Sequence, residues 1–235
     1  MDRGFSLLRV AILVLTLAIC LPSQARADAY ADANDAVQAQ RENNDDLAMK
    51  LYTRAIDSGE LDLSSSVIFF CYTNRGSLYA SRGDYDKAIQ DYNSALNLNP
   101  EFEVALFNRG VAYMEKRNYD KAMADFNAAI AQKPDYAKAF LNRGHIWRVK
   151  LKFKKALDDF NKAVELDASL LPALLGRGVA YLNLGDLDKA IADFTTVIKK
   201  DPKMKEAYMQ RAEAWTKKGD AAKAESDFNT ARSLQ

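Results

Sequence analysis

Residues 74–95 read NRGSLYASRGDYDKAIQDYNSA, and the pattern of this segment returns along the chain every 34 residues. Its opening triplet of a polar or small residue, an arginine and a small residue recurs as Asn74-Arg75-Gly76, Asn108-Arg109-Gly110, Asn142-Arg143-Gly144, Gly176-Arg177-Gly178 and Gln210-Arg211-Ala212. Internal repeats of this kind indicate the type of fold before individual helices or strands are assigned. A period of 34 residues indicates units that each consist of a helix, a turn and a second helix.

Three further positions keep their chemical type in all five copies. An aromatic residue follows the small residue by three positions, at Tyr79, Tyr113, Trp147, Tyr181 and Trp215. An alanine follows it by twelve positions, at Ala88, Ala122, Ala156, Ala190 and Ala224. A second aromatic follows by sixteen, at Tyr92, Phe126, Phe160, Phe194 and Phe228. Small residues at a helix crossing let two antiparallel helices approach closely, and the aromatics then fill the space between neighbouring helix pairs.

This pattern closely resembles the tetratricopeptide-repeat family, whose units carry an aromatic or large apolar residue, Leu-Gly, Tyr, Ala, Phe, Ala and Pro at these offsets. The resemblance covers about residues 29–235, and arginine replaces the usual leucine before the small residue in all five copies. It implies an all-α fold, a right-handed superhelical solenoid of antiparallel helix pairs. In this family the first helix of each pair lines the concave surface, and ligands usually lie in that groove.

The register divides the chain into a leader and six repeats. Upstream of the five clear copies, Ala48 and Tyr52 match a second helix, but Ala48 precedes Ala88 by 40 residues instead of 34. The surplus falls in Asp57–Ser66, which indicates either an extended loop or a longer start of the next helix. The predicted units are 1–27 for the leader and 28–68, 69–102, 103–136, 137–170, 171–204 and 205–235 for the repeats.

The turns inside the repeats carry residues that stop and start helices. Glycine suits the left-handed residue after a first helix, and it occurs there at Gly83, Gly185 and Gly219. Aspartate and asparagine can accept the free N–H groups that open a second helix, and they occur at Asp84, Asn118, Asp186 and Asp220. Repeat four instead has Leu151-Lys152-Phe153, so we expect its turn to be less well capped.

The leader has the composition of a cleavable secretion signal. Two arginines accompany an almost wholly apolar run at 10–21, and Ala25-Arg26-Ala27 supplies the small residues that a signal peptidase reads, with cleavage after Ala27. The run is shorter than the roughly 20 residues that a membrane-spanning helix needs. An uncleaved anchor and a lipoprotein acylated at Cys20 are the alternatives. We therefore expect a periplasmic or secreted protein without an integral membrane span after cleavage.

Charge and cysteine content exclude several classes of function. Without the leader, 30 basic residues face 31 acidic ones, so the net charge is near −1. Because the two signs are interspersed, no positive block is available for phosphates, and no nucleic-acid partner is expected. Beyond the leader Cys71 is the only cysteine. A disulfide within the mature chain is therefore impossible, and a lone thiol is typical of a small core side chain.

No catalytic residue, cofactor or metal site is predicted. The sequence has no Gly-x-Ser-x-Gly, no Gly-rich loop ahead of a helix, no Cys-x-x-Cys and no histidine pair, and the repeats leave no segment for a catalytic domain. The single histidine, His145, could face the groove, but a histidine without a partner pattern is more often an ordinary surface residue. We therefore expect a binding protein and not an enzyme.

The residues of the groove follow from the register of the first helices. Counting the small residue as position 8, positions 2, 5, 6, 9, 12 and 13 lie opposite the core. Their apolar members in the middle repeats are Phe107, Val111, Met114, Leu141, Leu175, Val179 and Leu182. Contiguous exposed apolar surface usually marks a partner site, so we predict that this set binds a peptide. The alternative is that neighbouring first helices bury part of it against one another.

Position 6 carries an asparagine in three consecutive repeats, at Asn74, Asn108 and Asn142. In family members with this residue it resembles a ladder of amides that hydrogen-bonds the backbone of an extended peptide, so the three join the predicted peptide-binding site. The alternative is that the asparagines bridge neighbouring helices by bonding one another. The family's clamp for a chaperone's C-terminal carboxylate needs lysine and asparagine at positions 5 and 9. This sequence lacks that pair, and the activity is not expected.

One arginine and one aspartate recur in step in each of the five clear copies. They are Arg75, Arg109, Arg143, Arg177 and Arg211, with Asp91, Asp125, Asp159, Asp193 and Asp227. The pattern predicts a ladder of ion pairs that fixes the register between helices. Such pairs need not add much net stability, because desolvation offsets much of their attraction.

Together these observations favour a scaffold or assembly factor of the cell envelope that binds an extended or amphipathic segment of a protein partner. The alternative is a structural subunit that forms a homo-oligomer through the sixth repeat, because no polar capping helix follows that repeat. The small side chains Ala222, Ala224 and Ala231 could instead keep this end soluble.

Overall fold

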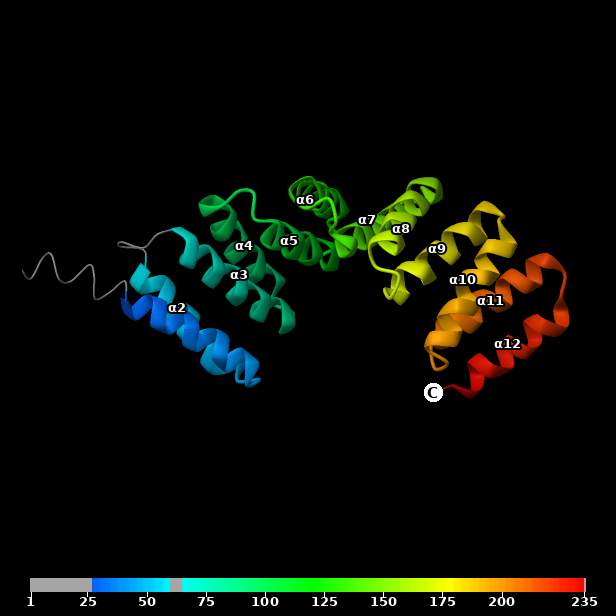
Figure 1. Cartoon of the computed structure of the whole chain (residues 1–235), viewed down its shortest axis with the longest axis horizontal. Coiled ribbons are helices and arrows are strands. Elements are labelled where there is room, and N and C mark those ends of the chain that lie inside the picture. The colour runs from blue at the N-terminus through cyan, green and yellow to red at the C-terminus, as the bar shows by residue number, and fades with distance from the viewer. Residues whose placement is uncertain (1–26, 60–64, 235) are drawn as a thin grey trace, which may run out of the picture. The chain divides into compact units, whose positions relative to one another are not determined.

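The computed structural model describes residues 27–59 and 65–234, and all regular structure in these ranges is helical. Residues 27–41 form a helix, and the helices that follow are α2 (Asp45–Gly59), α3 (Ser65–Ser81), α4 (Tyr85–Leu98), α5 (Glu103–Glu115), α6 (Tyr119–Gln132), α7 (Ala137–Val149), α8 (Phe153–Leu166), α9 (Leu171–Leu184), α10 (Leu187–Lys200), α11 (Lys205–Lys218) and α12 (Ala221–Ser233) (Figure 1). Apart from Ala27, the predicted signal peptide lies outside the described residues. None of the described helices is long and apolar enough to cross a bilayer.

The chain divides into two compact units, Met1–Arg117 and Asn118–Gln235. In the first unit α2 packs on α3, α3 on α4, and α4 on α5. In the second unit each helix from α6 to α12 packs on the next, and the first helices α7, α9 and α11 also contact one another in order. The predicted all-α repeat of packed helix pairs is confirmed.

The second aromatic of the repeat fills the narrowest space in each helix pair. Tyr92, Phe126, Phe160 and Phe194 are at most 1% exposed. A Cβ atom built on Gly144 of α7 would lie 2.8 Å from the Phe160 ring, and one built on Gly176 of α9 would lie 2.7 Å from it. Phe160 therefore contacts the first helix of its own repeat and that of the next. Because the ring reaches both backbones, only glycine fits at these two positions.

The repeat arginines join second helices of successive repeats. Arg143 donates from Nε and Nη2 to both carboxylate oxygens of Asp159, at 2.9 and 2.6 Å, and from Nη1 to Oδ1 of Asn127 at 2.8 Å. Equivalent contacts join Arg177 to Asp193 and Asn161, Arg211 to Asp227 and Thr195, Arg75 to Asp91 and Thr53, and Arg109 to Asn93. The predicted ion pair is thus confirmed for Arg75, Arg143, Arg177 and Arg211. The third partner was not predicted, although in four of the five contacts it lies two residues after the aspartate of the preceding repeat and recurs every 34 residues, at Asn93, Asn127, Asn161 and Thr195.

The turns follow the predicted pattern with one exception. Gly83, Gly185 and Gly219 adopt left-handed conformations, with φ of 78°, 86° and 88°. Asp84, Asn118 and Asp220 each accept a hydrogen bond from the backbone N–H three residues later. The exception is Asp186, whose side chain caps no backbone N–H of α10 and instead accepts from Nζ of Lys189. That cap prediction is wrong.

Two other expectations concern irregular segments. In repeat four Leu151 is left-handed with φ of 56°, and Lys152 provides no side-chain cap, so the turn is less well capped as expected. Within the segment Asp57–Ser66, α2 continues to Gly59 and α3 begins at Ser65, so both ends of the segment are helical, and residues 60–64 lie outside the described residues.

We predict that Gly178→Ala destabilises the protein by about 1–3 kcal/mol, as overpacking of a core usually does. The added methyl would lie 2.5 Å from Cε1 of Phe194, whose ring is fully buried. This clash outweighs the roughly 1 kcal/mol that alanine gains over glycine inside a helix. Urea unfolding followed by circular dichroism measures the change. The control is Ala212→Gly at the equivalent position of repeat six, which should cost only about 1 kcal/mol. Equal or higher stability of Gly178→Ala would show that the ring can move aside.

Arg143→Met should cost about 3–5 kcal/mol, because it leaves the Asp159 carboxylate buried without its counter-ion. The Asp159 side chain is 7% exposed, and burial already raises its pKa despite the arginine. The double variant Arg143→Met/Asp159→Leu should recover most of the loss in urea unfolding. Lys150→Met is the control, since Lys150 pairs at 2.7 Å with the highly exposed Asp120; its cost should stay below about 1 kcal/mol. Equal losses for the two single variants would contradict a structural role for the buried pair.

Candidate functional site

The predicted groove residues of the second unit are largely covered. Val179 and Leu182 are 9% and 3% exposed and belong to one cluster with Phe194 and Ala214. Leu141 is 9% exposed. The expectation that these three form exposed apolar surface is therefore wrong, and the alternative that neighbouring helices bury part of the set is correct for them. The remaining apolar residues are half-buried: Phe107, Val111 and Met114 in the first unit and Leu175 in the second.

A cavity of about 310 Å³ nevertheless opens on the first-helix face of the second unit. It is lined by His145 and Arg148 of α7, Pro172, Leu175, Gly176 and Val179 of α9, and Met204 and Glu206 at the start of α11. Leu175 and Val179 belong to the predicted peptide-binding set. Most of the others occupy positions 2, 6, 9 and 12 of the repeat. The register therefore identified the correct face, but selecting only apolar residues omitted the charged ones.

The polar groups of this cavity are held in an unusual environment. Burial, with a smaller contribution from the charge of Arg148, lowers the pKa of His145 to about 4. Its ring lies edge-on to Phe160, with the centroids 5.2 Å apart. The Nε atom of Arg148 is buried and has no hydrogen-bond partner within the described ranges. His145 is therefore not the ordinary surface residue that the sequence favoured, and it is neutral at neutral pH.

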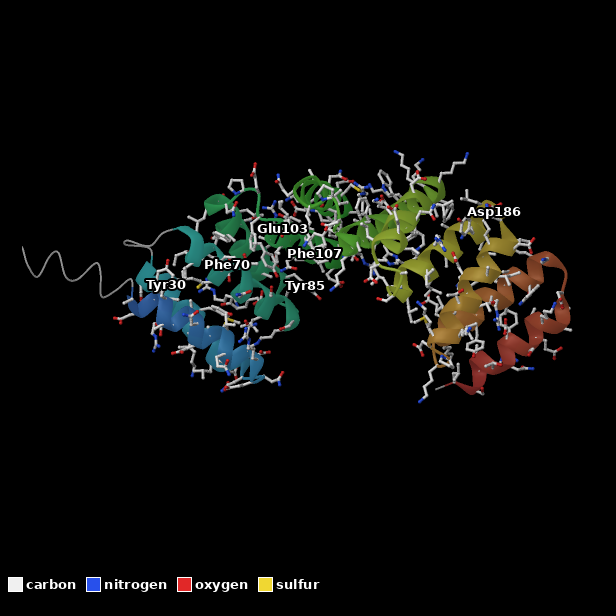
Figure 2. The ribbon with its side chains drawn as sticks, viewed as in Figure 1. Tyr30, Phe70, Tyr85, Glu103, Phe107 and Asp186 are labelled. Carbon is white, nitrogen blue, oxygen red and sulfur yellow. The ribbon has the colours of Figure 1, made fainter. Side chains whose placement is uncertain are left out.

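The first unit has its own cavity, of about 260 Å³, between residues 27–41 and α3. It is lined by Tyr30, Ala33, Asn34, Val37, Tyr52, Val67, Phe70, Cys71 and Asn74. Tyr30 and Phe70 are 39% and 49% exposed. Figure 2 labels both residues. Burial raises the pKa of Cys71 to about 12, which keeps the thiol protonated. Cys71 is 1% exposed, so its predicted role as a core side chain is confirmed.

The asparagines at position 6 contact neighbouring helices in the first unit. Nδ2 of Asn108 donates to Oγ of Ser77 at 3.2 Å, and Ser77 also accepts from the Tyr92 hydroxyl at 3.3 Å. The side chain of Asn74 hydrogen-bonds that of Tyr52. The alternative that the asparagines bond one another is therefore wrong for these two residues, whose side chains contact hydroxyl groups on neighbouring helices instead. Peptide binding by Asn74, Asn108 and Asn142 stays a prediction.

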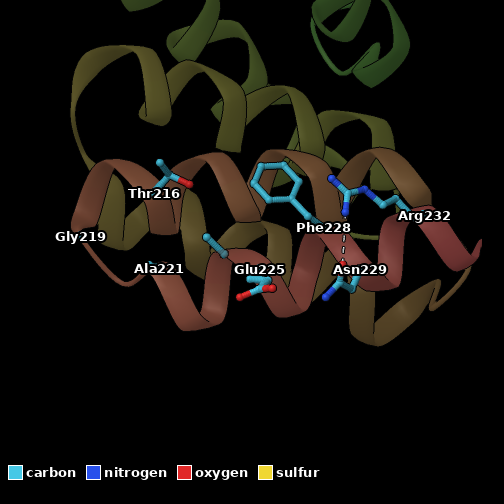
Figure 3. A pocket seen from close by; sticks show the side chains of 8 residues that line it. Thr216, Gly219, Ala221, Glu225, Phe228, Asn229 and Arg232 are labelled. Carbon is cyan, nitrogen blue, oxygen red and sulfur yellow. Dashed lines mark hydrogen bonds between the residues drawn. The ribbon is translucent and has the colours of Figure 1, made fainter.

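The outer face of the last repeat carries a cavity of about 470 Å³ between α11 and α12 (Figure 3). Phe228 lies on it and is 36% exposed, unlike its equivalents in the repeats before. Glu225 and Arg232 also line this cavity. Earlier repeats have apolar residues at these two positions, namely Ile89, Met123, Leu157 and Ile191, and Leu96, Ile130, Val164 and Ile198. Charged substitutions thus surround the exposed ring.

The polar surface of the last repeat does not come from the alanines that the sequence analysis considered. Ala224 and Ala231 are 4% and 3% exposed, so they do not form its outer surface. The expectation that these small side chains keep the end soluble is wrong for both, and of the three alanines only Ala222 is exposed. The polar character comes from Glu225 and Arg232, which the 34-residue register could have identified.

Comparison with known proteins gives three matches to family models. They are described as TPR repeat, over residues 76–117, and as Tetratricopeptide repeat, over residues 104–136 and 175–234. A tetratricopeptide repeat protein from Parabacteroides merdae ATCC 43184 has a similar structure, with a TM-score of 0.73 and 21% identity over 89% of this chain and 80% of that chain. The similarity to this protein concerns the fold alone.

Two further relatives have described roles. The structure of YrrB, a TPR protein with an unusual peptide-binding site, matches with a TM-score of 0.66 and 26% identity over 78% of this chain and 92% of that chain. Photosystem I assembly protein Ycf3 from Acaryochloris marina (strain MBIC 11017) is 29% identical over 106 residues, or 45% of this chain. The chain spans 60% of the length of that relative.

Lowering the pH should weaken the fold through His145. Its pKa is about 4 in the folded protein against about 6.5 in an unfolded chain, so between these values the unfolded state binds more protons. Stability conferred by the neutral ring is complete above pH about 6.5 and falls by at most about 3 kcal/mol as the pH drops through this window. Urea unfolding at pH 7 and pH 4.5 measures the effect, with His145→Gln as the comparison. An equal pH dependence in both proteins would contradict the assignment.

Proposed function

We propose a binding role for this chain, which belongs to the tetratricopeptide-repeat family: it holds a segment of a partner protein against its first helices. The fold is that of a protein–protein interaction scaffold, and members of this family bind proteins or peptides. We place the binding site in the cavity between α7, α9 and α11, and we assign the protein no catalytic step.

The observation that carries this proposal is the composition of that cavity. Its volume of about 310 Å³ lies at the lower end of the range for ligand sites, about 300–1,000 Å³. Leu175, Val179 and Met204 supply apolar lining, while Arg148 and Glu206 supply the few polar groups that orient a ligand. Because the cavity lies across three first helices, an extended segment laid over it contacts successive repeats.

Two relatives are consistent with this role. YrrB is described by its peptide-binding site, and Ycf3 is described as an assembly protein. By analogy, we propose that the bound segment belongs to a protein whose assembly or retention the scaffold assists. Analogy of fold alone does not fix the partner, because unrelated functions share this architecture.

We further propose that the protein acts in the periplasm or outside the cell. The support is the sequence of residues 1–27, with an apolar run of signal-peptide length followed by Ala25-Arg26-Ala27. Mass spectrometry of the N-terminus of the protein purified from its source tests this part. A mature chain that starts at Asp28 supports export, and a chain that retains the apolar run contradicts cleavage.

The binding role can be tested by selecting random decapeptides from a phage-displayed library on the purified protein. We expect enriched sequences whose affinity falls at least about tenfold in Leu175→Gln/Met204→Gln, because both changes put amide groups into the apolar part of the cavity. Leu184→Gln is the matched control, since Leu184 is 37% exposed on the same helix α9 and does not line the cavity. Failure to enrich any peptide would contradict the proposed binding function. Equal binding by the wild type, Leu175→Gln/Met204→Gln and Leu184→Gln would contradict it as well.

A further inference from the structure

We infer that the first-helix cavity of the second unit selects segments in which a carboxylate lies next to an apolar side chain, with the carboxylate bound by Arg148. This inference rests on the proposed binding function and specifies its ligand. The apolar neighbour packs on Leu175, Val179 and Met204, which line the same cavity.

Arg148 differs from the other arginines of the repeats. Four of the position-7 arginines each donate hydrogen bonds to a buried aspartate and to a side chain of the preceding repeat, as Arg143 does with Asp159 and Asn127. Arg148 occupies position 12, where the other four clear repeats have Ala80, Met114, Leu182 and Thr216. The repeat pattern therefore does not require a cation at position 12.

The donor atom at this site is also unsatisfied. Nε of Arg148 is buried without a hydrogen-bond partner among the residues that the structure describes. Leaving a buried donor unpaired costs about 1–3 kcal/mol, and more for a charged group. Because Nε itself is enclosed, a ligand in the cavity reaches the guanidinium from the side that lines the cavity.

A carboxylate matches this arrangement better than a phosphate does. The planar guanidinium binds either anion through two parallel N–H···O bonds, but one arginine balances only the single charge of a carboxylate. His145, the nearest titratable group on the same helix, is neutral at neutral pH and adds no second positive charge. Glu206 also lines the cavity and would repel a doubly charged phosphate.

Glu206 and Arg148 together set the orientation that we expect for a bound segment. It stands in the first turn of α11, whereas Arg148 stands in the last turn of α7. A bound segment that places its carboxylate on Arg148 can direct a backbone N–H or a basic side chain toward Glu206. We therefore expect Glu206→Gln to leave the preference for a carboxylate intact, because the anion does not need this residue.

The experiment repeats the decapeptide selection with the wild-type protein and Arg148→Gln. Wild type should enrich Asp or Glu beside an apolar residue, and Arg148→Gln should lose the acidic preference. Selected peptides are then synthesised with Asp or Glu changed to the amide, and their binding is measured by fluorescence anisotropy. The acidic peptide should bind Arg148→Gln at least about tenfold more weakly than wild type, while the amide peptide should bind both proteins alike.

Two controls distinguish a direct contact from a general effect of charge and identify the carboxylate. Lys154→Gln makes the same change of charge at an exposed site on α8 and should alter affinity less than about twofold, because exposed charges act weakly at a distance. Each peptide is also made with a free and with an amidated C-terminus. Dependence on the free terminus identifies a chain end as the carboxylate, and independence identifies an acidic side chain.

The outcomes separate this inference from the binding function itself. Peptides that lose affinity in Leu175→Gln/Met204→Gln but show no acidic preference, or an acidic preference that survives in Arg148→Gln, overturn the inference and leave the binding function standing. If no peptide is enriched by the wild-type protein, both fail. Circular dichroism melting of Arg148→Gln verifies that the variant is folded.

Discussion

The contact on which each repeat depends is the packing of a second-helix aromatic ring directly against first-helix backbone. In the second unit the Phe160 ring leaves no space for a Cβ atom on either Gly144 or Gly176. This close approach brings the helices near enough for Arg143 to reach Asp159 and Asn127. The apolar contact thus sets the spacing, and the directional hydrogen bonds then select one register at that spacing.

The candidate site differs from the rest of the repeats in the environment of its arginine. The arginines at position 7, such as Arg143, hydrogen-bond partners within the repeats. Arg148 differs from them because its buried Nε has no hydrogen-bond partner among the described residues. Arg148 and His145 lie on the face of α7 that borders α9, in a cavity that includes the start of α11. Their neighbours Leu175 and Val179 serve both the core and the cavity wall, because first helices contact one another along this face.

The outer face of α12 follows the same packing rule. Phe228 has its own first helix to pack on but is 36% exposed, because no described helix follows α12. Glu225 and Arg232 replace the apolar residues that contact the next repeat elsewhere, which suits a terminal face in contact with water.

The sequence by itself determined the helix-pair repeat, the buried alanine and aromatic positions, the left-handed glycines and the arginine–aspartate pairs, because each depends on residue type at a fixed offset from its neighbours. It also determined which positions of the first helices face the cavity. Only the tertiary structure decided that Leu141, Val179 and Leu182 are covered, that Asn108 bonds Ser77, and that Arg148 has an unpaired nitrogen among the described residues. Those facts depend on the distance between helices and on side-chain volumes at each crossing, which a 34-residue period does not specify.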